Sequence, residues 1–156
     1  MFPFLLAIAA LAAPAPPGEQ PVDPYTQSDA NAGATPFQGQ SMWRAFRRQP
    51  GVDRVIDGLV DRLIVDPRVA DIFRGQDIAR LRRTLKEQFC YILGGGCRYT
   101  GRDMQEGHHN LGIQTKDFNV LVGDLQLAMN RERVSIFAQN RLLAKLAPMK
   151  RSVVER

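Results

Sequence analysis

Residues that could bind a metal or transfer protons are scarce in this chain, and their positions limit its chemistry. The two histidines, His108 and His109, are adjacent. Neighbouring side chains on a helix point about 100° apart, so these two cannot both bind one ion from the same face. Cys90 and Cys97 are too few, and too far along the chain, to make a convincing zinc cluster with them. The sequence therefore predicts no two-histidine zinc site.

Other catalytic arrangements are missing as well. No serine or cysteine nucleophile has an evident His–Asp context. Gly94–Gly96 follows a predicted helix rather than opening one, so this run lacks the helix N-terminus that phosphate sites use. One imidazole remains, with Phe73 and Met104 as flat or soft packing partners. Haem iron is commonly held by a single histidine in an apolar helical pocket. An isolated histidine is more often a surface or hydrogen-bonded residue, so the residue types alone leave both interpretations open.

The elements that must position these side chains are predicted to be helices. Apolar residues recur at three- and four-residue intervals from Val52 to Ile64, which is the period of an amphipathic helix. Asp66-Pro67 is typical of an N-cap with proline in the first turn of a short helix. Gly75 is expected to end that helix.

Further helices are predicted along the rest of the chain. Asp77 is expected to cap a helix that Gly94–Gly96 ends, because each glycine costs a helix about 1 kcal/mol relative to alanine. Thr115 is expected to cap a helix that reaches residue 129, and a last helix is predicted over about residues 134–146. No segment alternates apolar and polar residues in the manner of a strand, so the predicted fold class is all-α.

The N-terminal part of the chain differs in composition from the rest. Phe2–Ala13 is almost entirely apolar but shorter than the about 20 residues that span a bilayer. It resembles the apolar core of a signal peptide, although no basic residue precedes it, and an uncleaved anchor is the alternative. Residues 16–40 are rich in Pro, Gly, Ala, Gln and Ser without an apolar period, which predicts a flexible linker.

Three regions follow from these patterns: a signal peptide or apolar anchor (1–15), a linker (16–40) and a helical domain (41–156). We therefore expect an exported protein, periplasmic or anchored at its N-terminus.

Basic residues are confined to the predicted domain. No Lys or Arg occurs before Arg44, whereas Glu19, Asp23 and Asp29 make the first 43 residues acidic. A basic domain could meet nucleic acid, anionic lipid or an anionic ligand. The arginines are spread through predicted helices with acidic residues between them, which disfavours nucleic-acid binding. Membrane contact is expected only through an uncleaved N-terminus.

A specific motif lies in the second half of the chain. Tyr99-Thr100-Gly101 leads to Met104 and, four residues later, to His108; Leu111-Gly112-Ile113 and Phe118 follow. This run resembles the proximal region of the group I truncated haemoglobins.

Less specific likenesses extend the resemblance to about residues 41–150. Gly94–Cys97 is similar to the glycine motif that closes the helix above the haem, and Asp66–Phe73 to the segment that carries a haem-stacking phenylalanine. Met42–Gly51 is similar to the start of the family, although Arg47-Arg48 stand where a Gly-Gly pair is usual.

The resemblance implies a two-over-two helical sandwich around a b-type haem. His108 would bind the iron, Phe73 would pack on the porphyrin, and His109 would face solvent. Other residues implied on the proximal side and at the haem edge are Met104, Ile113, Phe118 and Leu121. Candidate partners of the haem propionates, each of which could equally be a solvated surface residue, are Arg80, Arg83, Tyr99 and Arg102.

The chain departs from the family on the distal side. Typical members carry a tyrosine on the first long helix and a glutamine on the helix above the haem, and both hydrogen-bond bound oxygen. The matching positions here are Val60 and Leu85, with Leu81 on the same helical face. Gln88 lies one turn beyond Leu85, and we expect that it does not reach inward. The distal pocket is therefore predicted to be apolar, with weak oxygen binding and comparatively retained CO and NO binding.

The two cysteines have two interpretations. Cys90 and Cys97 could form a disulfide in an exported domain. Alternatively, Cys90 is a buried apolar residue and Cys97 a free thiol. Their spacing does not establish the Cα separation that a disulfide needs.

Three functions remain in competition. The favoured one is a haem b protein that reversibly binds O2, CO or NO, for oxygen transport, sensing or scavenging. The second is a haem redox enzyme, such as an NO dioxygenase, a nitrite reductase or a peroxidase-like enzyme, with an electron-transfer reductase as partner. A pocket without acid–base groups disfavours a peroxidase. The third is a haem-free interaction module, and the presence of both His108 and Phe73 argues against it.

Overall fold

A computed structural model of the chain describes residues 14–155. Nearly all of the predicted signal segment (1–15) lies outside the described residues. The described part contains helices and no strand, which confirms the all-α prediction. The helices are α1 (Ser41–Ala45), α2 (Arg48–Leu63), α3 (Ala70–Phe73), α4 (Ile78–Ile92), α5 (Met104–His108), α6 (Thr115–Arg131), α7 (Ile136–Leu146) and α8 (Lys150–Val153), with 3-10 turns η1 (Asp29–Ala32) and η2 (Ala147–Met149).

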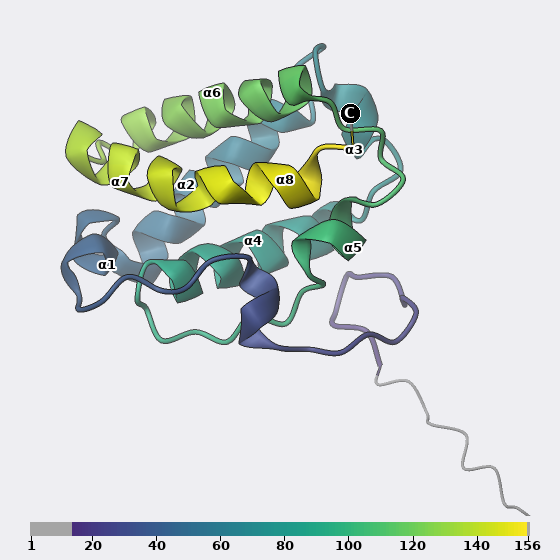
Figure 1. Cartoon of the computed structure of the whole chain (residues 1–156), viewed down its shortest axis with the longest axis horizontal. Coiled ribbons are helices and arrows are strands. Elements are labelled where there is room, and N and C mark those ends of the chain that lie inside the picture. Colours follow the sequence, from purple (N-terminus) through teal and green to yellow (C-terminus); the bar gives the residue numbers. More distant parts are fainter. Residues whose placement is uncertain (1–13, 156) are drawn as a thin grey trace, which may run out of the picture.

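The helices form two layers with the core between them. Figure 1 shows α6 and α8 on one side and α4 and α5 on the other, and α2 packs against both α4 and α6. The apolar stripe predicted for α2 is the centre of this core, because all its members inside the helix are at most 2% exposed: Val52, Val55, Ile56, Leu59, Val60 and Leu63. Burying a side chain of this kind contributes about 1.5–3 kcal/mol, so the stripe fixes how α2 sits between its neighbours.

Several helix ends follow the predicted capping. The Asp77 carboxylate accepts a hydrogen bond from the Arg80 backbone N–H at 3.0 Å and so begins α4. After Ile92 the chain leaves the helix, and Gly94 adopts a left-handed φ of 87° that favours glycine.

Two predicted helix starts are wrong. Gln114, not Thr115, is the N-cap of α6, because Asp117 turns back and accepts a hydrogen bond from the Gln114 N–H at 2.9 Å. The short helix expected after Asp66-Pro67 starts only at Ala70. The Asp66 carbonyl accepts hydrogen bonds from the N–H groups of both Val69 and Ala70, so the intervening residues form a turn.

The structure also differs from the expectation of a flexible linker over residues 16–40. This segment lies against the helical domain and is held by hydrogen bonds. The Gln20 N–H donates to Asp77 at 2.8 Å, the Tyr25 hydroxyl donates to the Thr100 carbonyl at 2.6 Å, and the Phe37 N–H donates to the Ile92 carbonyl at 2.8 Å. Ala32 is fully buried. The segment has little apolar surface to bury by itself, but the helical domain supplies its partners.

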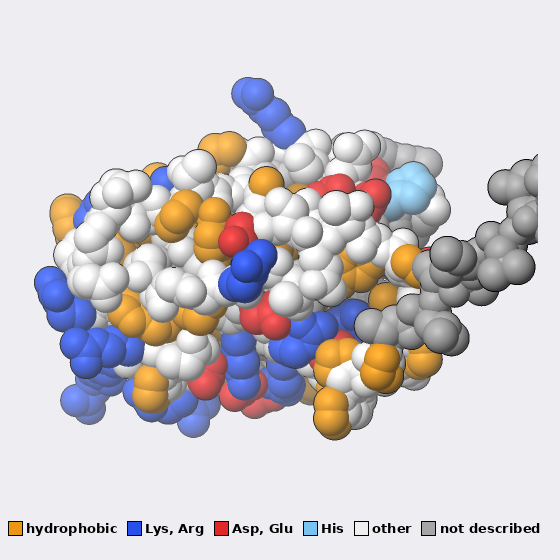
Figure 2. Space-filling view, turned by 90° about the horizontal axis from the view of Figure 1, so that it is seen from below, with side chains coloured by type: hydrophobic (Ala, Val, Ile, Leu, Met, Phe, Trp, Pro, Cys, Tyr) orange, Lys and Arg blue, Asp and Glu red, His pale blue; other side chains and the backbone are white. Residues whose placement is uncertain are grey.

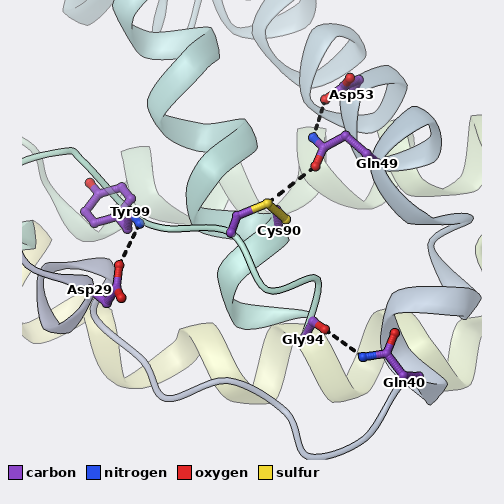
Figure 3. The surroundings of a disulfide bond; sticks show 8 residues. Asp29, Gln40, Gln49, Asp53, Cys90, Gly94 and Tyr99 are labelled. Carbon is purple, nitrogen blue, oxygen red and sulfur yellow. Dashed lines mark hydrogen bonds between the residues drawn. A yellow bond between two sulfur atoms is a disulfide. The ribbon is translucent and has the colours of Figure 1, made fainter.

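The two cysteines form a disulfide, which decides between the two interpretations of the sequence. Cys90 lies in the last turn of α4 and Cys97 in the loop beyond it, with their Cα atoms 5.6 Å apart. Figure 3 shows the bond beside the start of α2, where Gln49 Oε1 lies 3.6 Å from the Cys97 sulfur. A side chain at Gly95 would meet the Cys90 sulfur at 2.6 Å, so glycine is required for this close approach. The disulfide thus ties α4 to the loop that leads to α5.

No helix within residues 14–155 is long and apolar enough to cross a membrane.

Candidate functional site

His108 ends the short helix α5, which the sequence pattern did not predict. Asp103 caps this helix by accepting a hydrogen bond from the Glu106 N–H at 2.9 Å. The Nδ1 atom of His108 lies 2.7 Å from the carbonyl oxygen of Met104. Since a carbonyl only accepts, Nδ1 carries the hydrogen and Nε2 keeps its lone pair. Burial lowers the pKa of His108, which the Met104 carbonyl only partly offsets, so the imidazole is neutral at pH 7.

The loop after α5 is fixed by the C-terminal end of the chain. The Glu155 carboxylate accepts hydrogen bonds from the N–H groups of Asn110 at 2.6 Å and Gly112 at 3.0 Å. The Glu155 N–H in turn donates to the Ile113 carbonyl at 2.9 Å. His109 is exposed, as predicted. One imidazole of the pair is therefore held in a defined orientation, and the other faces solvent.

The other proximal-side residues that the resemblance implies are apolar, and most are incompletely covered. Phe73, Met104, Phe118 and Leu121 are half-buried, and Ile113 is 7% exposed. Phe73, Met104 and Leu121 pack against the core cluster without being sealed by it. A flat apolar group would remove such surface from water, which favours binding.

A haem fits this donor set. A neutral imidazole with a free Nε2 and a second nitrogen bound to a carbonyl is the usual state of a metal-ligating histidine. No group of three or more His, Cys, Asp or Glu side chains in the described part of the chain could hold a metal ion. His108 is therefore the candidate iron ligand that the sequence resemblance implies.

The positions predicted for the distal side carry no hydrogen-bond donor. Val60 is fully buried within α2, and Leu81 and Leu85 are half-buried along α4. The nearest polar side chains of α4 are engaged elsewhere. The Thr84 hydroxyl donates to the Arg80 carbonyl at 2.9 Å. The expectation that Gln88 does not reach inward is wrong, because its side chain is buried and its amide lies 3.4 Å from the Met104 sulfur. The Gln88 amide donates to the Ala32 carbonyl at 2.8 Å, on the N-terminal segment.

Arg80 and Arg83, two of the candidate propionate partners, are engaged by the protein itself. The Glu19 carboxylate, 2% exposed, pairs with both: it accepts from Arg83 Nη2 at 3.0 Å and lies 3.4 Å from Arg80 Nη2. Arg83 also donates to Glu87 at 2.8 Å and to the Thr100 hydroxyl at 2.6 Å. The hydrogen bond from Arg83 to Glu19 lowers the pKa of Glu19, because the guanidinium stabilises the charged form of the carboxylate.

Tyr99 and Arg102, the other two candidates, also contact the N-terminal segment. The Tyr99 hydroxyl donates to the Arg102 carbonyl at 2.9 Å, and its backbone N–H donates to Asp29 at 2.8 Å, as Figure 3 shows for the second bond. The Arg102 guanidinium donates to the Asp23 carbonyl at 3.2 Å and lies 5.2 Å from the centre of the Tyr25 ring. All four candidates therefore line one edge of the domain that the N-terminal segment covers.

Sequence reasoning missed the part that the N-terminal segment takes in this edge. The available signal was charge: Glu19, Asp23 and Asp29 are the only charged residues before Arg44, and arginines follow in the domain. Side chains of Glu19 and Asp29 and the backbone of Asp23 indeed hold this edge.

Two surface clefts lie away from His108. One, of about 350 Å³, is lined by Gln49, Asp53, Ala79, Arg82, Arg83, Lys86, Glu87 and Cys97. The other, of about 340 Å³, lies around Asp66 and Asp124. Neither contains Phe73 or the predicted distal residues, and their charged linings do not suit a haem.

Comparison with known proteins identifies the family. A model of the bacterial-like globins matches residues 42–155. The group 1 truncated hemoglobin GlbN of Nostoc sp. (strain MUN 8820) is 31% identical over 108 residues, which are 69% of this chain and 92% of the relative. The corresponding protein of Nostoc commune is 28% identical over the same shares of the two chains.

Solved structures show the same fold. The truncated hemoglobin of Tetrahymena pyriformis in its Fe(III) form superposes with a TM-score of 0.70 at 16% identity, covering 74% of this chain and 98% of that one. The 2/2 hemoglobin of Synechococcus sp. PCC 7002, in the cyanomet state and with covalently attached heme, gives 0.68 at 22% identity, covering 74% and 99%. With the family match and the all-helical architecture, these likenesses show that the chain is a haem-binding globin of the group I truncated, two-over-two type.

Proposed function

We propose that the protein holds haem b through His108 and reversibly binds diatomic ligands in an apolar distal pocket. The observation that carries this proposal is the 2.7 Å contact between His108 Nδ1 and the Met104 carbonyl. It supports one tautomer, with Nε2 free to bind, and it fixes the ring within α5. The carbonyl also raises the basicity of the ring, and such partners matter for metal affinity.

The haem is proposed to be bound without a covalent link through cysteine. Thioether attachment requires free thiols, commonly in a Cys-x-x-Cys-His motif. The chain has two cysteines, and both are in the disulfide. Apolar contacts and His108 would therefore hold a b-type haem. When bound, the haem iron would supply the coordination position for a diatomic ligand.

The chain's own distal residues favour binding over oxidation chemistry. Val60, Leu81 and Leu85 offer no proton or hydrogen bond, while Thr84 and Gln88 donate to backbone carbonyls. Peroxide cleavage benefits from a positioned proton donor, and NO dioxygenation needs a long-lived oxygen complex. Rapid, reversible binding of CO, NO and O2 agrees better with such a pocket.

Absorption spectra test the proposal. The full-length protein is purified, supplied with haem and recorded in ferric, reduced and CO-bound forms, beside His108→Ala and the matched control His109→Ala. We expect a Soret band that shifts with CO in the wild type and in His109→Ala. In His108→Ala we expect a weakened band that added imidazole restores. A colourless wild type, or a spectrum unchanged in His108→Ala, would contradict the assignment.

We also propose that the protein is exported. The Cys90–Cys97 disulfide supports this, because such bonds persist in oxidising compartments and are rare in the cytosol. The apolar run Phe2–Ala13 adds a signal-like feature. Cell fractionation combined with alkylation of free thiols tests it: we expect an oxidised protein outside the cytoplasm. A fully reduced protein in the cytoplasmic fraction would refute export.

A further inference from the structure

The start of α7 exposes two large apolar side chains next to each other. Ile136 is 65% exposed and Phe137 is 71% exposed. The buried face of α7 carries Ala138 and Leu142 instead. Scattered exposed apolar residues need no explanation, but an adjacent pair does.

Basic residues flank this pair in the sequence. From Arg133 to residue 154 the sequence contains five Lys or Arg residues and no Asp or Glu. Arg133 and Arg141 are exposed. Figure 2 shows Lys and Arg side chains gathered at the end of the molecule where Figure 1 places α1. The nearest acid in sequence, Glu132, is neutralised by Arg54 at 2.8 Å.

The cations are held over aromatic rings instead of carboxylates. The Arg141 guanidinium lies 5.1 Å from the centre of the Phe37 ring and 5.8 Å from that of Phe137. The Lys145 ammonium lies 4.9 Å from the centre of the Phe37 ring. The positive charge of Arg141 is thus positioned beside the exposed Phe137 ring and remains available to an anionic partner.

We propose that this surface, which we call the α7 surface (Arg133, Ile136, Phe137 and Arg141), docks the protein on an anionic phospholipid bilayer. The proposal differs from the expectation from the sequence, in which only an uncleaved N-terminus contacts a membrane. A bilayer interface offers both things that the surface requires. Its phosphates meet the cations, and its acyl boundary receives Ile136 and Phe137. A phosphate-rich but wholly polar partner would leave the apolar pair in water.

A single-stranded nucleic acid fits less well. It binds basic grooves in which aromatic rings stack on bases. Ile136 has no face for stacking, and Arg141 and Lys145 already lie over the Phe37 ring. The inference depends on the described surface alone, not on bound haem, so it can fail or succeed independently of the proposed function.

Vesicle flotation tests the inference with the full-length protein. Vesicles of phosphatidylcholine containing about one third phosphatidylglycerol are compared with phosphatidylcholine alone. The test variants are Ile136→Ser with Phe137→Ser, and Arg133→Gln with Arg141→Gln. The matched controls are Val65→Ser and Arg74→Gln, which lie on the α2–α3 side of the molecule. Val65 is 72% exposed, and the side chain of Arg74 is 80% exposed. Helical circular dichroism checks that each variant is folded.

We expect preferential binding to the anionic vesicles that weakens with salt. Each arginine removed should lower the partition coefficient about fivefold, and the apolar double substitution should lower it about tenfold or more, while both controls bind as the wild type does. Equal binding to both kinds of vesicle, or equal losses in test and control variants, overturns the proposal. So does a result in which the test variants lose binding to an oligonucleotide or lose self-association but still bind the vesicles normally.

Discussion

The carboxylate of Glu19 pairs with the guanidinium of Arg83, 64 residues away in the sequence, and this pair holds the N-terminal segment to α4. Glu19 is almost completely buried there, so its charge depends on Arg83 and Arg80 for compensation. The edge of the domain on which the candidate propionate partners lie is therefore organised by residues outside the region that the globin family model matches.

Replacing Glu19 by Gln should destabilise the protein and free the N-terminal segment. Hydrogen bonds to charged groups are worth about 1.5–3 kcal/mol, and Arg83 keeps Glu87 and Thr100 as partners, so we expect a loss of about 2 kcal/mol. Urea unfolding measures the free energy, and hydrogen exchange shows whether protection is lost first around Gln20. Asp23→Asn is the matched control, because only the Asp23 backbone carbonyl contacts Arg102. Equal effects of the two substitutions would argue against the pair.

The contribution of Glu19 should depend on pH in a defined direction. Its pKa is lowered in the folded state from the ordinary value of 4.5, chiefly by the hydrogen bond from Arg83. A lowered folded-state pKa stabilises the protein above the unfolded-state value, and this stabilisation disappears as pH falls through the folded-state value. The stability difference between wild type and Glu19→Gln should thus be constant near pH 7 and shrink below about pH 4.5. A difference that grows on acidification would contradict this sign.

Replacing Arg47 or Arg48 by glycine should stabilise the protein. Both adopt left-handed backbone conformations, with φ of 59° and 57°. An L-residue there costs about 1–2 kcal/mol, part of which glycine gives back through its greater freedom in the unfolded chain. We expect each substitution to glycine to stabilise the protein by about 0.5–1 kcal/mol, measured by thermal or urea unfolding. Arg44→Gly, inside α1, should destabilise it by about 1 kcal/mol. If all three variants lose stability, the backbone of this turn differs from the one described.

Restoring donors on the distal side should slow oxygen release from the haem-loaded protein. Leu85→Gln places an amide at a half-buried position of α4, and Val60→Tyr places a hydroxyl at a buried position of α2. A hydrogen bond of about 1.5–3 kcal/mol corresponds to a decrease of about 10- to 150-fold in the oxygen dissociation rate, with a smaller effect on CO. Stopped-flow measurements give both rates. Leu143→Gln, half-buried on α7, is the control. Unchanged rates in both variants would mean that these positions do not face the ligand.

Removing the disulfide should lower stability without abolishing the fold. The bond closes a short loop, with a sequence separation of seven between Cys90 and Cys97. Chain-entropy arguments assign such a loop about 2–3 kcal/mol. We expect this loss in the Cys90→Ser, Cys97→Ser double variant, and in the wild type when a reductant is added during urea unfolding. A wild type that is insensitive to the reductant, with the bond shown to be reduced by thiol alkylation, would contradict a stabilising role.

Local sequence patterns were enough to predict the long helices and their core faces. The spacing of Val52 to Leu63 allows one arrangement in which a helix buries every apolar residue, and the structure buries all of them. Asp77 and the glycines after Ile92 likewise mark helix ends through local hydrogen bonding and backbone freedom, which neighbouring residues decide. The run from Tyr99 to Ile113 was specific enough to identify the family.

Interactions between residues far apart in the sequence depend on how the helices pack, which local patterns do not reveal. Whether Cys90 and Cys97 pair depends on the path of the loop between them, which their spacing does not fix. The order of residues 16–40 depends on partners such as Arg83, because a segment poor in apolar residues is held only by what it packs against. The tautomer of His108 depends on the helix α5, since its turn brings the Met104 carbonyl to Nδ1. Local patterns thus determined the elements, and contacts across the fold decided the chemistry of the site.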